Sequence, residues 1–471
     1  MRIILKNKSI EAWKKNGKNV LMIYNYNDNI IVKADGAWVF DVDGKKYLDF
    51  SNGQFCTIVG HNHPKLIEKL KKQMGKLIHT AVHSISPSVL EASAKLAKVA
   101  PGNLDKCLFL STGTEANECA IKIAKTYTKK PGIAGFTLGY SGASLATKSI
   151  SLNPLNYQEY GSSPRVPESY NFLTPYCKKC PVNSQYPECD FLCLKHFEDK
   201  LGHKIKNIAA FVVEPVLSSG GVIVPPPGYF VRLKKLARKH GALLIADEAQ
   251  TGFGRIGKWF GIEHHKVLPD MIVIAKTAGG GYPVSGIITN EDIARKTILE
   301  GLSHISSHQS DPLQGAAVSA VIEIIKKEQL IKNANEMGKY LFDKLMVLKH
   351  KYQIIKEVRG IGLMIGMELQ NKGPENVYSP ESIGYRLRNE LMKKGLMLNY
   401  GSAIGPVFRI FPPLNVKREE IDLAISILDK ALKKAEKGKL KKYKSRNPYA
   451  REKIKTTLKE KFNKVKNKIK E

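Results

Sequence analysis

The alternation of short apolar runs with helical segments between about residues 105 and 290 constrains the fold more than any other feature. The runs KCLFLS, AAFVVEP, ALLIADE and DMIVIAK read as strands, and segments such as TEANECAIKIAKTY and GYFVRLKKLARKHG have helical spacing. Strands that alternate with helices predict a parallel sheet with helices on both faces. We therefore expect an α/β fold.

The two ends of the chain predict a second, smaller unit. Residues 30 to 50 alternate apolar and polar side chains around Asp43-Gly44, the signature of a β-hairpin. After about residue 320 come a long helical stretch, the apolar segments VRGIGLMIGMEL and VFRIFPPL, and a last helix. We expect a large domain with a mostly parallel mixed sheet over residues 63–322, and a small α+β domain built from residues 1–62 and 323–435.

The formal net charge of the 471-residue chain is +32, and much of the excess lies in a basic tail over residues 436–471. From Gly438 to Glu471 we count 14 Lys and Arg against 3 Asp and Glu, a net charge of +11. Such a tail either binds nucleic acid electrostatically or is simply solvated. Its aromatic residues are too sparse for base stacking, so we expect no nucleic-acid partner.

The sequence also predicts where the protein resides. No apolar run approaches the ~18 residues of a membrane span, and the N-terminal segment lacks the apolar core of a signal peptide. We therefore expect a cytoplasmic protein without a membrane partner.

A lysine stands at the end of one predicted strand, in DMIVIAKTAGGGYPVSG. Burying an unpaired ammonium group costs several kcal/mol. If Lys276 forms a Schiff base, it avoids much of that cost, and desolvation makes it a better nucleophile. The alternative is that its side chain reaches the surface from the strand end.

Two other predicted strand ends carry polar residues. Ser111-Thr112-Gly113-Thr114 lies between a strand and a helix, where backbone N–H groups bind phosphate, although Ser/Thr with Glu115 is also an ordinary capping box. Asp247 ends the run LLIAD. A carboxylate at that place can pair with a cation inside the fold, and the alternative is a helix cap or a salt bridge in a loop. Ligands bind at the carboxyl ends of parallel strands. A phosphate cradle, an acid and a lysine at one such edge are what pyridoxal phosphate requires.

The chain resembles the class III pyridoxal-phosphate aminotransferases from about residue 30 to 432. The resemblance rests on LDFSNGQ, GHNHP, STGTEANECAIKIAK, EPVLSSGG, LLIADEAQTGFGRIG, IAKTAGGGYP, SHQSDPL, VRGIGLMIGMEL and FRIFPPL. Gln54, SSGG and SDPL are most similar to the 2,2-dialkylglycine decarboxylase branch. The resemblance implies a fold-type-I enzyme, a homodimer with composite active sites, and amino-group transfer from an amino acid to a 2-oxo acid.

The resemblance also assigns roles to residues around the cofactor ring. Lys276 would hold the aldehyde as an imine (an aldimine) and then act as acid and base, and Asp247 would pair with the pyridine nitrogen. Gln250 would hydrogen-bond the ring hydroxyl, with Ala249 on one ring face and Tyr140 on the other. Relatives carry an aromatic residue followed by His and Gly where this chain has Tyr140-Ser141-Gly142, which leaves ring tilt and substrate scope open.

Other matching positions concern the phosphate and the substrate. Gly113 and Thr114 would bind the phosphate, helped by Ser307 from a second subunit. Arg409 would bind the substrate carboxylate, for which its planar fork is suited. Two further residues would line the substrate side, Gln54 and Ser219. Decarboxylation-dependent transamination and amino acid racemisation remain open as alternative reactions.

Two metal sites are also open. The decarboxylase has an alkali-cation site, and Asp311, Ser307 and Gln309 match its ligands, whereas Val82 stands where a serine ligand is expected. An insertion over residues 176–194 carries four cysteines spaced C-x2-C-x8-C-x3-C. Four thiolates at this spacing suit zinc or an iron–sulfur cluster, and the alternative is unligated packing in a loop. These four are Cys177, Cys180, Cys189 and Cys193.

Overall fold

The computed structural model describes residues 8–21, 26–151, 165–370 and 382–441. Most of the basic tail predicted for residues 436–471 therefore lies outside the described residues. Among the described helices, none is both long and apolar enough to cross a membrane.

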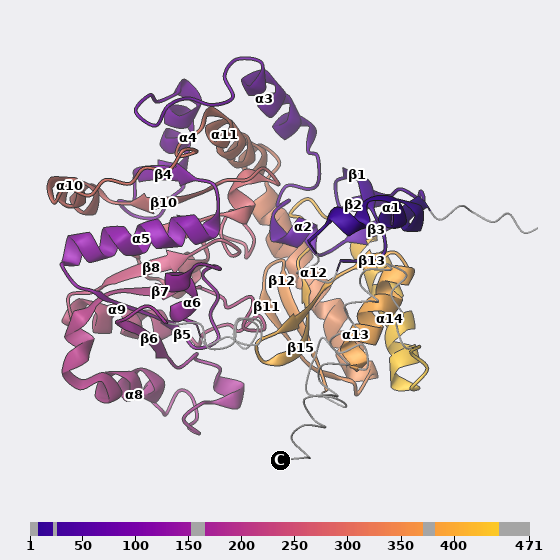
Figure 1. Cartoon of the computed structure of the whole chain (residues 1–471). Helices are drawn as coiled ribbons and strands as arrows, with labels where there is room; N and C mark the ends of the chain where they lie inside the picture. The colour runs from indigo at the N-terminus through magenta and orange to yellow at the C-terminus, as the bar shows by residue number, and fades with distance from the viewer. Residues whose placement is uncertain (1–7, 22–25, 152–164, 371–381, 442–471) are drawn as a thin grey trace, which may run out of the picture.

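The large domain is built on a seven-stranded sheet (Figure 1). The strands from β9 to β6 are parallel, and β10 runs antiparallel to both β9 and β4. This confirms the predicted α/β fold with a mostly parallel mixed sheet. In spatial order the strands are β4 (Lys106–Leu110), β10 (Ser285–Thr289), β9 (Met271–Ile274), β8 (Leu243–Asp247), β7 (Ile208–Val213), β5 (Gly132–Phe136) and β6 (Ser169–Phe172).

The central strands are apolar throughout because both faces of the sheet are covered. Along β7, Phe211 and Val213 pack into one core, while Ala210 and Val212 pack into a second core with residues of α5. Such strands show no polar alternation in the sequence. The helices of this domain include α3 (Pro64–Met74), α4 (Pro87–Ala97), α5 (Gly113–Thr128), α6 (Leu145–Ser149), α8 (Leu192–Leu201), α9 (Tyr229–Lys239), α10 (Glu291–Leu299) and α11 (Pro312–Lys327).

The small domain joins the two ends of the chain. The predicted hairpin is present, since β2 pairs antiparallel with β3, and Gly44 takes a φ of +82° in its turn. β13 pairs in parallel with β3, with Leu396 opposite Leu48. Figure 1 shows these indigo N-terminal strands beside the orange and yellow C-terminal elements. The sheet order is β1 (Ile31–Asp35), β2 (Trp38–Asp41), β3 (Lys46–Asp49) and β13 (Leu396–Met397).

A second four-stranded sheet completes this domain. Its strands are β11 (Ile355–Ile361), β12 (Met364–Leu369), β15 (Gly405–Ile410) and β14 (Asn399–Ser402), and its helices include α12 (Leu330–Lys351), α13 (Ile383–Lys393) and α14 (Arg418–Glu436). Trp38 Nε1 donates to Glu420 Oε1 at 2.9 Å, which ties the N-terminal strands to α14. Near the N-terminus lie α1 (Lys8–Asn16) and the short α2 (Asn52–Phe55).

Candidate active site

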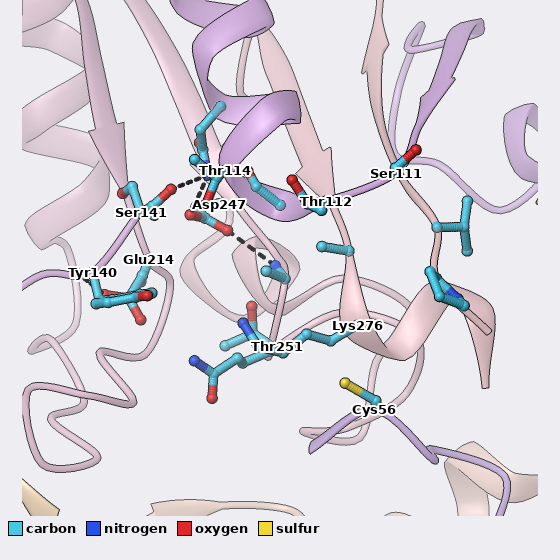
Figure 2. A pocket seen from close by; sticks show the side chains of 18 of the residues that line it. Cys56, Ser111, Thr112, Thr114, Tyr140, Ser141, Glu214, Asp247, Thr251 and Lys276 are labelled. Carbon is cyan, nitrogen blue, oxygen red and sulfur yellow. Dashed lines mark hydrogen bonds between the residues drawn. The ribbon is translucent and has the colours of Figure 1, made fainter. Parts of the chain in front are cut away.

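A cavity of about 330 Å³ opens beyond the carboxyl ends of the large sheet's strands (Figure 2). Seven residues predicted to bind the cofactor line it: Gly113, Thr114, Tyr140, Asp247, Ala249, Gln250 and Lys276. The cavity thus brings together seven predicted residues that are up to 163 positions apart in the chain.

Lys276 lies two residues beyond the end of β9 and begins the short 3-10 helix η5 (Lys276–Gly279) with a φ of +33°. The chain then turns through Gly280 and Gly281, whose φ angles are +59° and +111°. A Cβ on Gly280 would lie 2.8 Å from Leu66 Cδ2 and 2.9 Å from Val321 Cγ2, so both side chains would have to shift. The glycines that follow the lysine therefore let the chain reverse tightly against α3 while Lys276 faces the cavity.

Asp247 stands at the end of the adjacent parallel strand, opposite Val273. Its carboxylate is 4% exposed and accepts hydrogen bonds from Asn117 Nδ2 at 2.8 Å and from Ala249 N at 3.1 Å. Burial raises the pKa of Asp247, and the contacts from Asn117, Ala249 N–H, Lys276 and the Ser141 hydroxyl oppose that rise. The acid is therefore held in place by neutral donors, with Lys276 as the nearby cation.

The N-terminus of α5 borders the same cavity. Thr112 caps the helix by accepting from Glu115 N at 3.2 Å, and Thr114 Oγ1 accepts from Ala143 N at 3.2 Å. A Cβ on Gly113 would lie 3.0 Å from Ala275 Cβ, so a larger residue would press on the segment that carries the lysine. The capping interaction and an anion site coexist here, because the dipole and free N–H groups of a helix start favour an anion.

The loop from Tyr140 to Gly142 closes one side of the cavity. Tyr140 N donates to Glu214 Oε1 at 2.9 Å, and the Ser141 carbonyl accepts from Asn117 Nδ2 at 2.9 Å. Gly142 has a φ of +146°, and a Cβ there would lie 2.8 Å from Thr114 Oγ1. The loop therefore packs directly on the start of α5, and the Ser141 hydroxyl faces the acid.

Glu214 is a second buried acid in the cavity. It follows β7, is 5% exposed, and accepts from Ser218 N at 3.2 Å as well as from Tyr140 N. Burial and the neighbouring charge of Asp247 raise the pKa of Glu214 to about 8. The group is therefore largely protonated at neutral pH. Nothing local in the sequence indicates the protonation of Glu214 or its partner Tyr140.

The lining residues fit pyridoxal phosphate. Over the described ranges, Gln250 Oε1 is buried with no hydrogen-bond partner, which leaves it available to a ligand hydroxyl. Ala249 is small and 8% exposed, so a flat ring has room beside it. Lys276, Asp247 and the helix start offer an amine, an acid and an anion site around one cavity (Figure 2).

Four other predicted site residues do not line this cavity in the single chain. Arg409 on β15 is 8% exposed, and its guanidinium carbon lies 5.0 Å from the centroid of the Phe55 ring. Gln54 is exposed one residue before Phe55, and Cys56 after it lines the cavity. Ser219 is buried and its carbonyl accepts from Ala403 N at 2.9 Å. Ser307 is exposed.

The surroundings of Asp311 differ from what the resemblance led us to expect. His79 Nδ1 lies 2.6 Å from Asp311 Oδ1, and His308 Nδ1 lies 2.6 Å from Asp311 Oδ2. Both carboxylate oxygens therefore contact imidazoles, while Val82 is 37% exposed. Sequence reasoning missed both histidines, because nothing local in the sequence brings His79 next to Asp311.

The four cysteines of the insertion do come together. All four line a second cavity of about 20 Å³ beside the start of α9. Cys177 is exposed and the other three are half-buried.

Comparisons with known proteins identify the family of the chain. Residues 23–432 match the family model described as aminotransferase class-III. The chain is 35% identical to an uncharacterised aminotransferase of Schizosaccharomyces pombe, over 90% of this chain and 95% of that protein. It is 33% identical to a leucine/methionine racemase of Thermococcus litoralis, over 88% and 93%.

A comparison with solved structures also finds transaminases. An amine transaminase from an uncultivated Pseudomonas species, determined in its PLP-bound form, superposes with a TM-score of 0.80 at 28% identity and covers 86% of this chain and 95% of that chain. The chain therefore belongs to the class III aminotransferase family and is a pyridoxal-phosphate-dependent aminotransferase.

Proposed function

We propose that the enzyme moves an amino group from an amino acid to a 2-oxo acid, with Lys276 as the residue that holds the cofactor and transfers the proton. One observation carries this assignment: Lys276 and Asp247 extend from adjacent parallel strands into one cavity that also contains the start of α5. When bound, pyridoxal phosphate supplies a ring that accepts electrons from the substrate's α-carbon.

The chain's own residues divide the remaining work. Asp247 would keep a positive charge on the ring nitrogen, since an opposing charge within a buried site favours the cationic form. Asn117 and the Ser141 hydroxyl hold that carboxylate, so Ser141 supplies polar support where relatives carry His. Lys276 Nζ, once freed by the incoming amine, would move the proton at the α-carbon. The N–H groups of Gly113 and Thr114 would bind the phosphate.

The substrate side is assigned to Arg409, Gln54 and Ser219. The assignment of Arg409 is supported by its position. Its guanidinium carbon lies over the ring of Phe55, and the next residue, Cys56, lines the cavity. A guanidinium binds a carboxylate through two parallel hydrogen bonds. Glu214 is protonated at neutral pH and so offers a proton rather than a second negative charge to an incoming acidic substrate.

Borohydride reduction followed by peptide mass spectrometry tests the assignment of Lys276. The reduced cofactor is expected on the peptide that contains Lys276, and Lys276→Ala is expected to lower amino transfer by at least about 10³-fold. Lys235→Ala, an exposed lysine on α9, is the matched control. Label on another lysine, or an active Lys276→Ala enzyme, would rule the assignment out.

Two alternative reactions use the same residues. The resemblance of Gln54 and SSGG to the decarboxylase branch favours loss of carbon dioxide, and Cys56, two residues after Gln54, lines the cavity. Carbon dioxide release from 2-aminoisobutyrate would establish that reaction, and its absence would leave ordinary transamination. The archaeal racemase among the relatives favours racemisation, which chiral chromatography of one enantiomer incubated without a 2-oxo acid would detect.

A homodimer is supported by the exposed face around His79 and His308, whose rings lie 5.0 Å apart. Large apolar side chains are exposed in the two segments that meet there. They are Leu77 (42% exposed), Ile78 (56%), Val82 (37%), Ile85 (62%) and Ile305 (76%). Ser307 is exposed in the same segment, which is consistent with its predicted contribution to the partner's phosphate site. Several large apolar side chains exposed near one another are typical of a subunit interface.

The remaining assignments come from the sequence. An alkali cation at Asp311 would have to displace the two imidazoles that contact its carboxylate. A potassium-dependent activity, compared with tetramethylammonium salts, would support that cation. We place the protein in the cytoplasm and without a nucleic-acid partner, and cell fractionation and salt-dependent mobility-shift assays test both statements.

A further inference from the structure

Four free cysteines converge at one point outside the active site. Cys177, Cys180, Cys189 and Cys193 all line the cavity of about 20 Å³ that Pro226 and Tyr229 close from the other side. The established reaction gives these thiols no role. Their convergence, across a loop of 17 residues, is what a ligand-binding function requires.

The backbone around the sulfurs is arranged as it is around metal-bound thiolates. Cys177 begins the 3-10 turn η2 (Cys177–Lys179), and Ser184 N donates to Cys180 Sγ at 3.5 Å. The Leu194 N–H also forms a backbone hydrogen bond to the Cys193 sulfur near the start of α8. Backbone N–H groups that point at sulfur stabilise the thiolate over the thiol.

The sulfurs also need a cation to become thiolates. All four cysteines line one cavity of about 20 Å³, so four thiolates there would hold four negative charges at close range. Like charges crowded in one place are stable only around a positive ion, and a metal ion displaces thiol protons outright.

Lysines do not supply that positive charge. Lys178 Nζ lies 2.7 Å from Glu357 Oε1, and Lys179 Nζ lies 3.6 Å from Glu368 Oε1. Both ammonium groups are therefore directed to carboxylates of the small domain rather than to the sulfurs.

We propose that Cys177, Cys180, Cys189 and Cys193 bind a single Zn²⁺ ion as a structural tetrathiolate site. The ion would take the place of four thiol protons, which leave to solvent, and the site would carry a net charge of −2. Cysteine pairs with two or three intervening residues are usual ligands of closed zinc sites.

The size of the cavity favours one ion over a cluster. Its volume of about 20 Å³ is close to that of a single water-sized sphere, whereas a four-iron cluster needs several times that space. Without the ion the sulfurs are spaced more widely than metal ligands: within the described residues, the only three ligand atoms that lie within 4.8 Å of one another belong to His79, His308 and Asp311. Binding would draw the sulfurs inward to Zn–S bonds of about 2.3 Å.

The position of the insertion suggests what the ion does. Tyr176, directly before Cys177, donates from its hydroxyl to Glu357 and Glu368, both at 3.2 Å. The same two carboxylates bind Arg359 Nη1, and Arg359 Nε donates to the Gly221 carbonyl at 2.9 Å. The ion would therefore brace a network that runs from the insertion through β11 and β12 to the loop that carries the predicted substrate residue Ser219.

Elemental analysis of the purified holoenzyme tests the proposal independently of the cofactor pocket. We expect one zinc per chain, with neither stoichiometric iron nor acid-labile sulfide. An organomercurial reagent should release that zinc from the native protein as it modifies four thiols, followed with a zinc-sensitive dye. One iron–sulfur cluster per chain, or metal-free protein after expression in zinc-supplemented medium, would overturn the proposal.

Variants locate the ion. Cys177→Ser and Cys189→Ser are each expected to lower zinc content at least about tenfold, whereas Cys107→Ala, in β4, should retain it. Cobalt-substituted wild-type protein should show sulfur-to-cobalt charge-transfer bands, which keeps the test valid even where a variant fails to fold. Full zinc in both serine variants would place the ion elsewhere and refute the site.

Discussion

The side-chain amide of Asn117 donates a hydrogen bond of 2.8 Å to the carboxylate of Asp247, which lies 130 positions later in the chain. The same amide also donates to the Ser141 carbonyl at 2.9 Å. Asn117 thus holds the acid and the loop beside Tyr140 in one arrangement. It does so with a neutral donor, which leaves the charge of Asp247 available to the cofactor ring.

Asn117→Ala should weaken catalysis through Asp247. The variant removes one donor that opposes the upward pKa shift of this acid, so we expect the basic form to appear at higher pH. The acidic limb of the pH–rate profile should shift upward, with kcat about tenfold lower at neutral pH. Asp247→Asn should lower kcat further, by about 10²–10³-fold. Asn389→Ala, which removes a buried amide bonded to Tyr385 O, is the control, and an unshifted profile in Asn117→Ala would contradict this role.

Gly113→Ala should reduce cofactor affinity. The added Cβ would lie 3.0 Å from Ala275 Cβ and would displace either the phosphate-binding turn or the segment before Lys276. We expect the dissociation constant for pyridoxal phosphate to rise about tenfold or more, measured by absorbance titration of the apoenzyme. Gly75→Ala, whose Cβ would have no contact closer than 3.7 Å, serves as the matched substitution. Equal affinities of the two variants for pyridoxal phosphate would show that Gly113 does not take part in phosphate binding.

Glu214 should make the apoenzyme less stable as pH rises. Its folded-state pKa is about 8 and its ordinary value is 4.5. Between these values the native state keeps a proton that the unfolded chain has released, so the free energy of unfolding falls as pH rises from about 4.5 to 8. The contribution is fully present below pH 4.5 and is of the order of a few kcal/mol.

Glu214→Gln is the variant that isolates this effect, because it keeps the shape of the side chain and removes the titration. Urea unfolding at pH 5.5 and pH 8 should show a smaller loss of stability in Glu214→Gln than in the wild type. Identical pH dependences in the two proteins would mean that Glu214 is ionised in the fold.

Ile305→Asp should weaken the proposed dimer. Ile305 is 76% exposed in the single chain and lies in the segment that leads to Ser307 and His308. A charge buried in an apolar interface is costly, so we expect the dimer dissociation constant to rise at least about 10²-fold by analytical ultracentrifugation. Ile298→Asp, at a residue 70% exposed on α10, should leave the dimer intact. If both variants behave alike, the interface lies on another face.

The sequence identified the elements whose signals are local. The runs that became β4, β7, β8 and β9 are apolar because both sheet faces are covered, and the hairpin turn at Gly44 needs a positive φ that glycine accepts. Lys276 and Asp247 could be predicted as partners because carboxyl ends of neighbouring parallel strands meet at one edge.

Contacts between distant segments could not be predicted in this way. The bonds of Asn117 to Asp247, of Tyr140 N to Glu214 and of His79 to Asp311 join residues 130, 74 and 232 positions apart. Arg409, Gln54, Ser219 and Ser307 stay predictions, since none of them lines the cavity of the single chain.

By itself, the sequence determined the strand–helix order, the polar residues at the strand ends and hence the family of chemistry, because these depend on side-chain periodicity and composition within short segments. Only the tertiary structure decided which acids are buried, what holds them, and that four cysteines share one small cavity. Those properties depend on burial and on distances between segments that the fold brings together, and no local pattern encodes them.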